Sequence, residues 1–470
     1  MAKKSSIWLL ILASILALII GAILISEWVS QTKPQSGDII KIEYLGTDSL
    51  EGGRFNVAIF YAEYWSETSG GAKIGAKLFV PKAKPPNEGW PVKVWLHGFG
   101  GPGFDFWHYP YVEGDWKVRG YLAGMVFASN GVVSLNPWVT GAGPSEPIAT
   151  YSPFSLERNA QTAFDGFKAL NKLESYFNKR NKLVNKLGRK LKLDNSRQIM
   201  STNCISSPTL IYFAAHVEEH PEVSNLKALV ADTFLPSAAY LTYYILPLSV
   251  EMEGEEAARS IALWAGPPWC LAEDRGWDLG IFFTEKAIEL FETPVETPAG
   301  TYGLMRASQL EPLEKSTVGP VLYEAVKKDL GHDPNGEEIL NWTFSKEALS
   351  LLDHSSIEEL LNDEFYRKYL ADADPFFEQN IEPFSVDIPL FVIGNGDTTI
   401  SNPPLPSPAD RFEIGGLSKI ETLRSWGWNV SYFYERGLAT TGIRPGPGFN
   451  WVFRNLKNIL YPGGLPEEMR

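Results

Sequence analysis

The sequence predicts an α/β protein with a mostly parallel sheet, helices on both faces, a large helical cap and an N-terminal transmembrane helix. Three observations predict this arrangement. Apolar β-rich runs alternate with helical segments over much of the chain, an order that builds parallel sheets. The alternation stops between residues 234 and 385, which are helical and aromatic. Residues 7–25 form an uncharged apolar run of 19 residues.

The N-terminal apolar run is long enough to cross a membrane. As a helix it would extend about 28 Å, close to the thickness of the hydrocarbon core of a bilayer. Lys3 and Lys4 precede it, so the positive-inside rule leaves the short N-terminus in the cytoplasm and the bulk of the protein outside. A cleaved signal peptide is the alternative, but the run is longer than a usual h-region and no A-x-A-like site follows it. We therefore expect an uncleaved, single-pass signal anchor and a membrane location.

The remaining elements follow from hydrophobic periodicity. Residues 39–83 alternate in hydrophobicity between glycine pairs, which predicts antiparallel hairpins at the start of the sheet. Later strands are apolar runs that end in glycine-rich or turn-rich loops, and Ser155 is the expected N-cap of the first long helix. After the hairpins we predict strands at 92–101, 131–138, 197–204, 226–232, 388–397 and 429–435, and helices at 155–177, 208–217 and 449–460.

These elements divide the chain into four parts. Residues 1–30 hold the cytoplasmic stub and the anchor, and the polar segment 31–38 is a linker. Residues 39–233 and 386–470 form the sheet domain. Residues 234–385 form a helical cap between two strands of that sheet.

Composition excludes several classes of function. The 470 residues carry 56 acidic and 42 basic side chains, and this net charge of −14 argues against a nucleic-acid partner. Two cysteines cannot form a disulfide framework or a cysteine-rich zinc site. The sequence has no Walker A motif, no GxGxxG after a strand and no HExxH. We therefore expect no cofactor and no metal.

Three loop sequences carry a resemblance to a known family. HGFGG occupies residues 97–101, STNCISS residues 201–207 and GNGD residues 394–397, each in or at the end of a predicted strand. In this order they resemble the α/β-hydrolase superfamily, in particular its capped esterases, lipases and peptidases, over residues 73–460 with the cap unmatched. The resemblance implies an α/β-hydrolase fold that hydrolyses a carboxylic ester or related acyl bond. Its substrate would be a small-molecule or lipid-like acyl compound.

The resemblance places Cys204 at the nucleophile position. The family's elbow reads small-x-nucleophile-x-small, because the turn is strained and its backbone lies close to neighbouring chain. Residues 202–206, Thr-Asn-Cys-Ile-Ser, fit that spacing with Thr and Ser in place of the glycines. A thiol needs less activation than a hydroxyl, since part of it ionises near neutral pH. The alternative is that Cys204 is simply a small buried residue.

The resemblance also implies an oxyanion hole and an acid. The backbone N–H groups of Phe99 and Ile205 would point at the developing oxyanion. Asp397, in the GNGD turn, stands at the acid position, and Asp232 at the end of an earlier strand is an alternative acid. His97 is expected to be a structural member of its turn.

The family's catalytic histidine is missing. In the family this histidine follows the last strand, after the nucleophile and the acid. The last histidine here is His354, which precedes Asp397, so an ordinary triad cannot be assembled. Another histidine or the carboxylate of Glu435 serves as the base, or the protein is a catalytically impaired homologue that binds a ligand or partner in the same cleft. The candidate histidines are His216, His220, His332 and His354, and the two bases that we predict are His354 and Glu435.

A basic segment lies before the strand that leads to Cys204. Residues 176–193 contain seven basic residues and no acidic one. Leu183, Leu187 and Leu191 recur at four-residue spacing, which predicts one amphipathic helix with a cationic face. That face either is solvated or docks on anionic headgroups beside the anchor.

Overall fold

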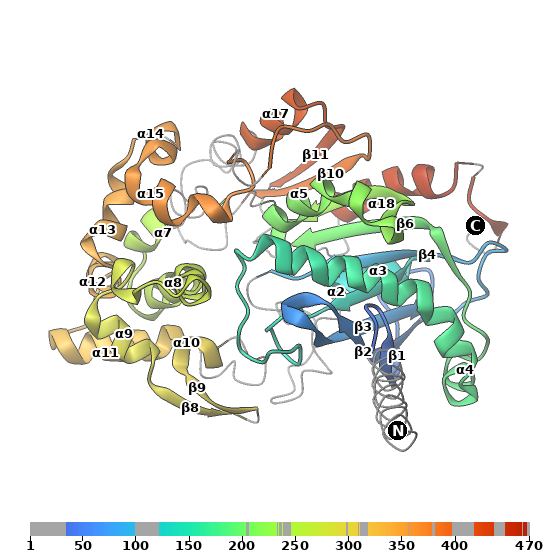
Figure 1. Ribbon diagram of the computed structural model, residues 1–470, viewed down its shortest axis with the longest axis horizontal. Coiled ribbons are helices and arrows are strands. Elements are labelled where there is room, and N and C mark those ends of the chain that lie inside the picture. The colour runs from blue at the N-terminus through green and yellow to red at the C-terminus, as the bar shows by residue number, and fades with distance from the viewer. Residues whose placement is uncertain are drawn as a thin grey trace, which may run out of the picture.

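The computed structural model describes most of the chain beyond its N-terminal segment (Figure 1). The described residues are 34–98, 122–203, 206–232, 234, 237, 246–297, 299–308, 310, 318–355, 357–377, 381–396, 418–436, 447–462 and 464–467. Among these residues, no helix is both long and apolar enough to cross a membrane. The predicted anchor, residues 7–25, lies outside the described residues.

A nine-stranded sheet runs through the described part of the chain, in the order β1-β2-β3-β5-β4-β6-β7-β10-β11. The first three strands and β5 pair antiparallel, and every pair from β5 onward is parallel. The mostly parallel sheet that the sequence predicts is therefore confirmed. The strands are β1 (Ile39–Asp48), β2 (Val57–Ser66), β3 (Ala72–Pro81), β4 (Trp90–Leu96), β5 (Val133–Pro137), β6 (Leu193–Asn203), β7 (Leu226–Asp232), β10 (Leu390–Gly396) and β11 (Val430–Arg436).

Helices cover both faces of the sheet. The helices that do so are α2 (Leu122–Ala128), α3 (Leu156–Asn178), α5 (Ser207–Ala215) and α18 (Pro447–Leu460), and α17 (Ser418–Ser425) packs beside β11. Gly166 of α3 lies against Val94, whereas the neighbouring Lys93 places its Nζ 3.8 Å from the centre of the Phe127 ring of α2. Successive residues of a strand point to opposite faces, so α3 and α2 cover opposite faces. Phe127 also contacts Phe449, which places α18 beside α2.

Burial on both faces explains why the central strands are apolar along their whole length. Every residue of β4 is buried, including Lys93. A parallel strand that is covered by helices on both sides has no solvent face on which polar residues would alternate. β1 differs because it is an edge strand, and several of its side chains are partly or fully exposed.

A helical cap is inserted between β7 and β10 and lies beside the sheet domain (Figure 1). Its buried hydrophobic side chains form a cluster separate from that of the sheet domain. The cap also contains a short antiparallel hairpin, which the sequence analysis did not predict. Its elements are α7 (Leu246–Val250), α8 (Gly254–Arg275), α9 (Glu285–Phe291), β8 (Pro294–Thr297), β9 (Gly300–Gly303), α10 (Leu304–Ala307), α11 (Val318–Leu330), α12 (Gly336–Thr343), α13 (Lys346–Leu349), α14 (Ile357–Asn362) and α15 (Glu364–Tyr369).

The loop before α3 attaches the cap to the sheet domain. Ser155 stands at the N-cap position, as predicted, but its side chain makes no capping hydrogen bond. Its hydroxyl instead donates to Asp274 of α8 at 2.7 Å, and Arg158 pairs with the same carboxylate at 3.3 Å. Arg306 of the cap donates to the carbonyl of Tyr151 at 2.7 Å. Ser155, the predicted N-cap residue of α3, therefore connects the sheet domain to the helical cap.

The single amphipathic helix predicted over residues 176–193 is wrong. α3 ends at Asn178, and a separate helix, α4 (Asn181–Leu187), follows it. Gly188 then adopts a positive φ of 85°, a conformation that favours glycine, and its N–H bonds to the carbonyl of Val184. Leu191 lies beyond α4, where its N–H donates to the side chain of Asn178 at 2.7 Å.

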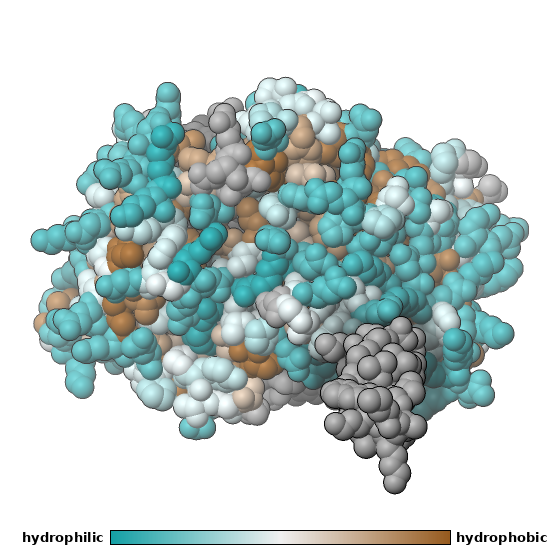
Figure 2. Space-filling model, in the orientation of Figure 1, coloured by the Kyte–Doolittle hydropathy of each residue, from teal (hydrophilic) through white to brown (hydrophobic). Residues whose placement is uncertain are grey.

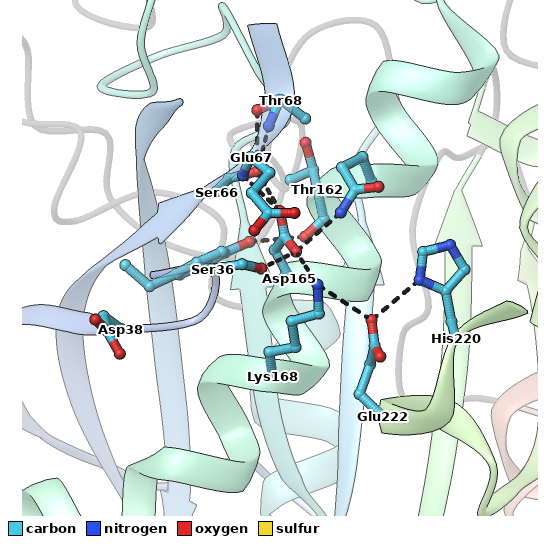
Figure 3. A network of polar contacts seen from close by, with 12 residues as sticks. Ser36, Asp38, Ser66, Glu67, Thr68, Thr162, Asp165, Lys168, His220 and Glu222 are labelled. Carbon is cyan, nitrogen blue, oxygen red and sulfur yellow. Dashed lines mark hydrogen bonds and ion pairs between the residues drawn. The ribbon is translucent and has the colours of Figure 1, made fainter. Parts of the chain in front are cut away.

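A buried carboxylate joins the N-terminal segment, β2 and α3 (Figure 3). Asp165 of α3 has no exposed surface. Its oxygens accept hydrogen bonds from the hydroxyls of Ser36 and Ser66, the backbone N–H of Glu67 and the amide of Gln161, and they pair with Lys168. Lys168 also pairs with Glu222, which contacts His220. Asp165 therefore links segments that are far apart in the sequence.

Replacing Asp165 should destabilise the folded protein. We expect Asp165→Ala to lower the free energy of unfolding by about 3 kcal/mol, because removing one member of a buried ion pair leaves its donors unpaired. Urea unfolding of the variant measures this. Asp353→Ala, at an exposed carboxylate of the cap, is the matched control and should change stability by less than about 0.5 kcal/mol. Equal effects of the two substitutions would contradict a central role for Asp165.

Candidate functional site

The carboxyl ends of four parallel strands meet at one edge of the sheet. β4 ends at Leu96, β6 at Asn203, β7 at Asp232 and β10 at Gly396. The strand register places Asp232 opposite Asn203 on one side and opposite Ile393 on the other. In open α/β sheets, ligands bind at this edge. The chain enters the cap from here, and the cap lies beyond this edge (Figure 1).

A buried hydrogen bond crosses the ends of β6 and β7. The side-chain amide of Asn203 donates to Asp232 at 3.2 Å. Both side chains are almost fully buried. Asn203 immediately precedes Cys204, so this bond holds the end of the strand that leads to the predicted nucleophile. The sequence gives no signal for it, because the pairing depends on the register of two strands.

The N-terminus of α5 is also bonded to the residue that follows β4. Ser206 occupies the N-cap position of α5, but its hydroxyl does not cap the helix and donates instead to the carbonyl of His97. Both residues are buried. α5 begins at the next residue, so the partially positive N-terminus of a helix faces this edge of the sheet. This bond, too, was not predicted from the sequence.

His97 is held by the backbone on both sides of its ring. Its Nε2 accepts a hydrogen bond from the backbone N–H of Val139 at 3.0 Å. Its Nδ1 lies 2.6 Å from the carbonyl of Gly98, to which it donates as the neutral tautomer. Complete burial disfavours the charged ring and lowers the pKa of His97 to about 4. These contacts agree with the structural role expected for His97.

The lowered pKa predicts a pH-dependent stability. The unfolded chain protonates His97 below about pH 6.5, whereas the folded protein does so only near pH 4. Stability from His97 is therefore complete above pH 6.5 and is lost as the pH falls from 6.5 to 4, by about 3 kcal/mol in total.

Urea unfolding at several pH values tests this prediction. His97→Gln keeps an acceptor near the Nε2 position and does not titrate, so the stability difference between wild type and variant should shrink by about 3 kcal/mol between pH 7 and 4. His332→Gln, at an exposed histidine of the cap, is the control substitution. If the stability difference between wild type and His97→Gln does not change with pH, His97 is not kept neutral.

Four of the predicted site residues, Phe99, Cys204, Ile205 and Asp397, lie outside the described residues. Asp397 directly follows Gly396, the last residue of β10. Cys204 and Ile205 lie in the sequence between Asn203 and Ser206. Their roles therefore stay predictions.

Glu435, one of the two bases predicted from the sequence, lies in β11. The register pairs it with Asn395 of β10, two residues before Asp397. β11 is the third strand along the sheet from β6. At the usual spacing of strands, the backbone of β11 stands about 14 Å from that of β6.

His354, the other predicted base, lies on the cap. Its Nε2 is 3.0 Å from a carboxylate oxygen of Asp363, an arrangement in which a carboxylate orients an imidazole. The pair lines a surface cavity of about 490 Å³ together with three further polar side chains, Glu358, Glu359 and Asn362. Within the described part of the chain, no group of three or more His, Cys, Asp or Glu side chains is placed to hold a metal ion.

The other described histidines contact groups away from the strand ends. His216 follows the last residue of α5, about 13 Å along the helix from its start, and bonds to the carbonyl of Tyr212. His220 contacts Glu222 and stacks on Phe164. His332 is exposed on the cap. The described contacts thus connect none of these three histidines to Asn203 or Ser206.

A buried carboxyl group at the return from the cap was also missed. Asp374 has no exposed surface and accepts hydrogen bonds from the hydroxyl of Tyr366 at 3.1 Å and the N–H of Phe376 at 3.0 Å. Burial raises its pKa, although Lys419 of the sheet domain and Ser237 act in the opposite direction. It connects the cap to the segment that leads back to β10. Its local sequence contains no motif that would have identified it.

Solved structures share this fold. The chain is similar to the rice cell wall degrading esterase LipA from Xanthomonas oryzae, with a TM-score of 0.54 and 15% identity over 93% of this chain and 100% of that one. A putative hydrolase from Legionella pneumophila has a TM-score of 0.51 and 13% identity over 90% and 96% of the two chains. Candida antarctica lipase A in its closed state has a TM-score of 0.51 and 11% identity over 92% and 84%. No family model and no curated protein sequence matches the chain. At these identities the likeness supports an α/β-hydrolase-like fold and nothing narrower.

Proposed function

We propose, from this α/β-hydrolase-like fold, that the protein is a membrane-anchored hydrolase of a carboxylic ester or related acyl bond, with Cys204 at the nucleophile position. One observation carries the proposal. The residues that flank Cys204 and Ile205 are both held at the meeting point of the parallel strands, Asn203 by Asp232 and Ser206 by the carbonyl of His97. In the family, a strand, a short turn and a helix in this place form the elbow that carries the nucleophile.

The oxyanion hole would be built from the same two loops. The proposed donors are the N–H groups of Phe99, in the loop after His97, and of Ile205, in the turn before Ser206. The hydrogen bond from Ser206 to the His97 carbonyl supports this pairing because it ties the two loops together. One such donor is worth about 3 kcal/mol in the transition state.

The reaction begins with the attack of the Cys204 thiolate on the acyl carbon. The bond to the alcohol oxygen then breaks, the alcohol leaves with a proton, and a thioester remains on the enzyme. Water cleaves the thioester, which releases the acid and restores the thiol. Both stages need a group that moves a proton. Asp397 is the proposed acid that orients this group, and Asp232, already bonded to Asn203, is the alternative.

The identity of the base separates two versions of the proposal. His354 has a carboxylate partner that orients its ring, but this pair lies on the cap. Glu435 lies on the sheet, but three strands away from β6. Movement of the cap toward the strand ends would favour His354. Without such a group, the proposed enzyme is slow.

The missing histidine favours a second candidate function. A catalytically impaired homologue would keep the fold and the cleft to bind a ligand or a partner. The observation in its favour is that no histidine follows Asp397 in the chain. Measured turnover distinguishes the two candidate functions, because only the hydrolase converts an acyl substrate.

We expect low turnover of p-nitrophenyl acetate and butyrate by the full chain in detergent. A cysteine without a base has a pKa near 8.5, so only a few per cent is thiolate at pH 7. Oxyanion donors alone leave a rate about 10³ to 10⁴-fold above that of water. The part of the activity that depends on the thiol should be lost in Cys204→Ala and kept in Cys270→Ala, while the rate that comes from the oxyanion donors alone should remain in both variants. Robust turnover that depends on Cys204 would contradict the low rate, and loss in His354→Ala or Glu435→Gln would identify the base. Equal background rates in all variants would favour the binding protein.

Alkylation tests the thiol without a substrate. Cys270 is fully buried, so iodoacetamide should label Cys204 first in the folded protein and Cys270 only after unfolding. The rate of labelling against pH reports the pKa of Cys204. A midpoint near 8.5 indicates an unassisted thiol, and a midpoint well below 7 indicates a positively charged neighbour.

The proposed anchor predicts how the protein fractionates. The full chain should stay in membranes after a carbonate wash, with residues beyond Gln31 open to protease added outside intact cells. Leu16→Arg, at the centre of the apolar run, should weaken insertion by about 3 kcal/mol, while Ser30→Arg should not. A soluble mature chain that begins near residues 27–31 would show that the run is a cleaved signal peptide.

A further inference from the structure

Seven basic side chains lie on the segment that runs from the end of α3 through α4 to the start of β6. We call these side chains the basic face. Six of its members are exposed and Arg189 is partly buried, whereas Leu183, Leu187 and Leu191 point inward and are buried. The break at Gly188 keeps these leucines in the core although the single helix predicted from the sequence does not form. The members are Lys179, Arg180, Lys182, Lys186, Arg189, Lys190 and Lys192.

The basic face lacks acidic partners. Among the described residues, none of its seven side chains forms an ion pair with a carboxylate. The two nearest acids in the sequence are engaged elsewhere, Glu174 with the N–H of Leu193 and Asp194 with Arg197. Over α3 and α4 the surface is hydrophilic (Figure 2). In a protein with a net charge of −14, such a concentration of positive charge is locally uncompensated.

Aromatic and apolar side chains lie within the basic face. Arg180 stacks over the ring of Tyr176, and Lys186 lies 5.3 Å from the centre of the Tyr44 ring. Tyr176 donates to the carbonyl of Ile40, a residue of the edge strand β1 whose surface is 42% exposed. Basic residues mixed with tyrosine and an exposed aliphatic side chain are the composition of a surface that meets lipid headgroups.

The N-terminal segment is fastened to the same helix. Lys172 of α3 binds the carbonyl of Ser36 at 2.9 Å and the carboxylate of Asp38 at 2.7 Å, and Ser36 donates to Asp165 (Figure 3). The first described residues therefore run along α3 toward its C-terminal end. The chain that leads from the predicted anchor reaches the protein beside α3.

The distances allow the basic face to reach the membrane. The residues between the apolar run and Pro34 are 26–33, and extended they span at most about 28 Å. From Asp165 to Lys179, α3 rises about 21 Å. A protein held by this linker can therefore lay the C-terminal end of α3 on the membrane that holds its anchor.

We propose that the basic face docks on anionic lipid headgroups of the membrane that holds the anchor. This inference rests on the proposed anchoring, though not on the proposed hydrolysis. Each basic residue near an anionic surface contributes about a fivefold factor to binding, so the six exposed members together hold the domain firmly against the lipid. Docking would orient the sheet domain and its cap relative to the membrane.

Lysine acetylation of the full chain in bilayer nanodiscs tests the proposal. One set of nanodiscs holds phosphatidylcholine alone, and the other an equimolar mixture with phosphatidylglycerol. Mass spectrometry should show that acetylation of Lys182, Lys186, Lys190 and Lys192 slows at least about tenfold in the anionic discs. High salt should remove this protection. The exposed lysines Lys227, Lys328 and Lys346 are internal controls and should react equally in both sets.

A charge-reversal variant distinguishes docking from a general effect of lipid. Lys182→Glu, Lys186→Glu and Lys190→Glu together should lower binding by about 100-fold or more, so that Lys192 regains its rate in anionic discs. The control carries Lys227→Glu, Lys328→Glu and Lys346→Glu, with the same change in total charge, and should keep Lys192 protected. Circular dichroism verifies that both variants fold. If either variant does not fold, the wild-type acetylation rates in neutral and anionic discs provide the decisive comparison.

Two results would overturn the proposal. Equal acetylation of the basic face in neutral and anionic discs would show that it does not meet the lipid. Protection by a soluble oligonucleotide in neutral discs, without protection by anionic lipid, would assign the face to nucleic acid. Failure of the anchor is recognised separately, because the chain would then not co-purify with neutral discs.

Discussion

The hydrogen-bond register of the parallel strands is the constraint on which the rest of the structure depends. Parallel strands share a direction, so β4, β6, β7 and β10 must all end at the same edge. Loops that are more than 100 residues apart in the chain are thereby brought together, as the bond from Ser206 to His97 shows. The same constraint explains how a cap of helices can be inserted after β7 without disturbing the sheet. The cap extends from the edge, and its own buried cluster stabilises it.

Three polar groups inside this framework, Asp165, His97 and Lys93, are tolerated because specific partners hold them. A buried carboxylate is unfavourable unless hydrogen bonds and a counter-charge replace water, and Asp165 receives both. His97 avoids the cost in a different way, because it stays neutral and uses both ring nitrogens for backbone contacts. Lys93 lies over the ring of Phe127. These contacts fix segments from distant parts of the chain in one arrangement.

The proposed chemistry depends on which group replaces the missing histidine. A thiol can attack an acyl group with less help than a hydroxyl, so a cysteine at the elbow reduces the need for a strong base in the first stage. It does not remove that need in the second stage, when water must attack the thioester. The pair of His354 and Asp363 is complete in itself, but it lies on the cap rather than at the strand ends. Cap position would therefore control catalysis if His354 is the base.

Local patterns determined the strands of the sheet domain, because hydrophobic periodicity and glycine-rich loops are properties of neighbouring residues. The segment 176–193 shows where this fails, since leucines at four-residue spacing predicted one helix and Gly188 with its positive φ ended it. Ser155 and Ser206 show the same limit, because both stand at N-caps and bond instead to distant partners. The pairing of Asn203 with Asp232, the burial of Asp165 and the neutrality of His97 were decided by the tertiary structure alone. Each of these three features depends on strand register or on complete burial. Residues adjacent in sequence determine neither register nor burial.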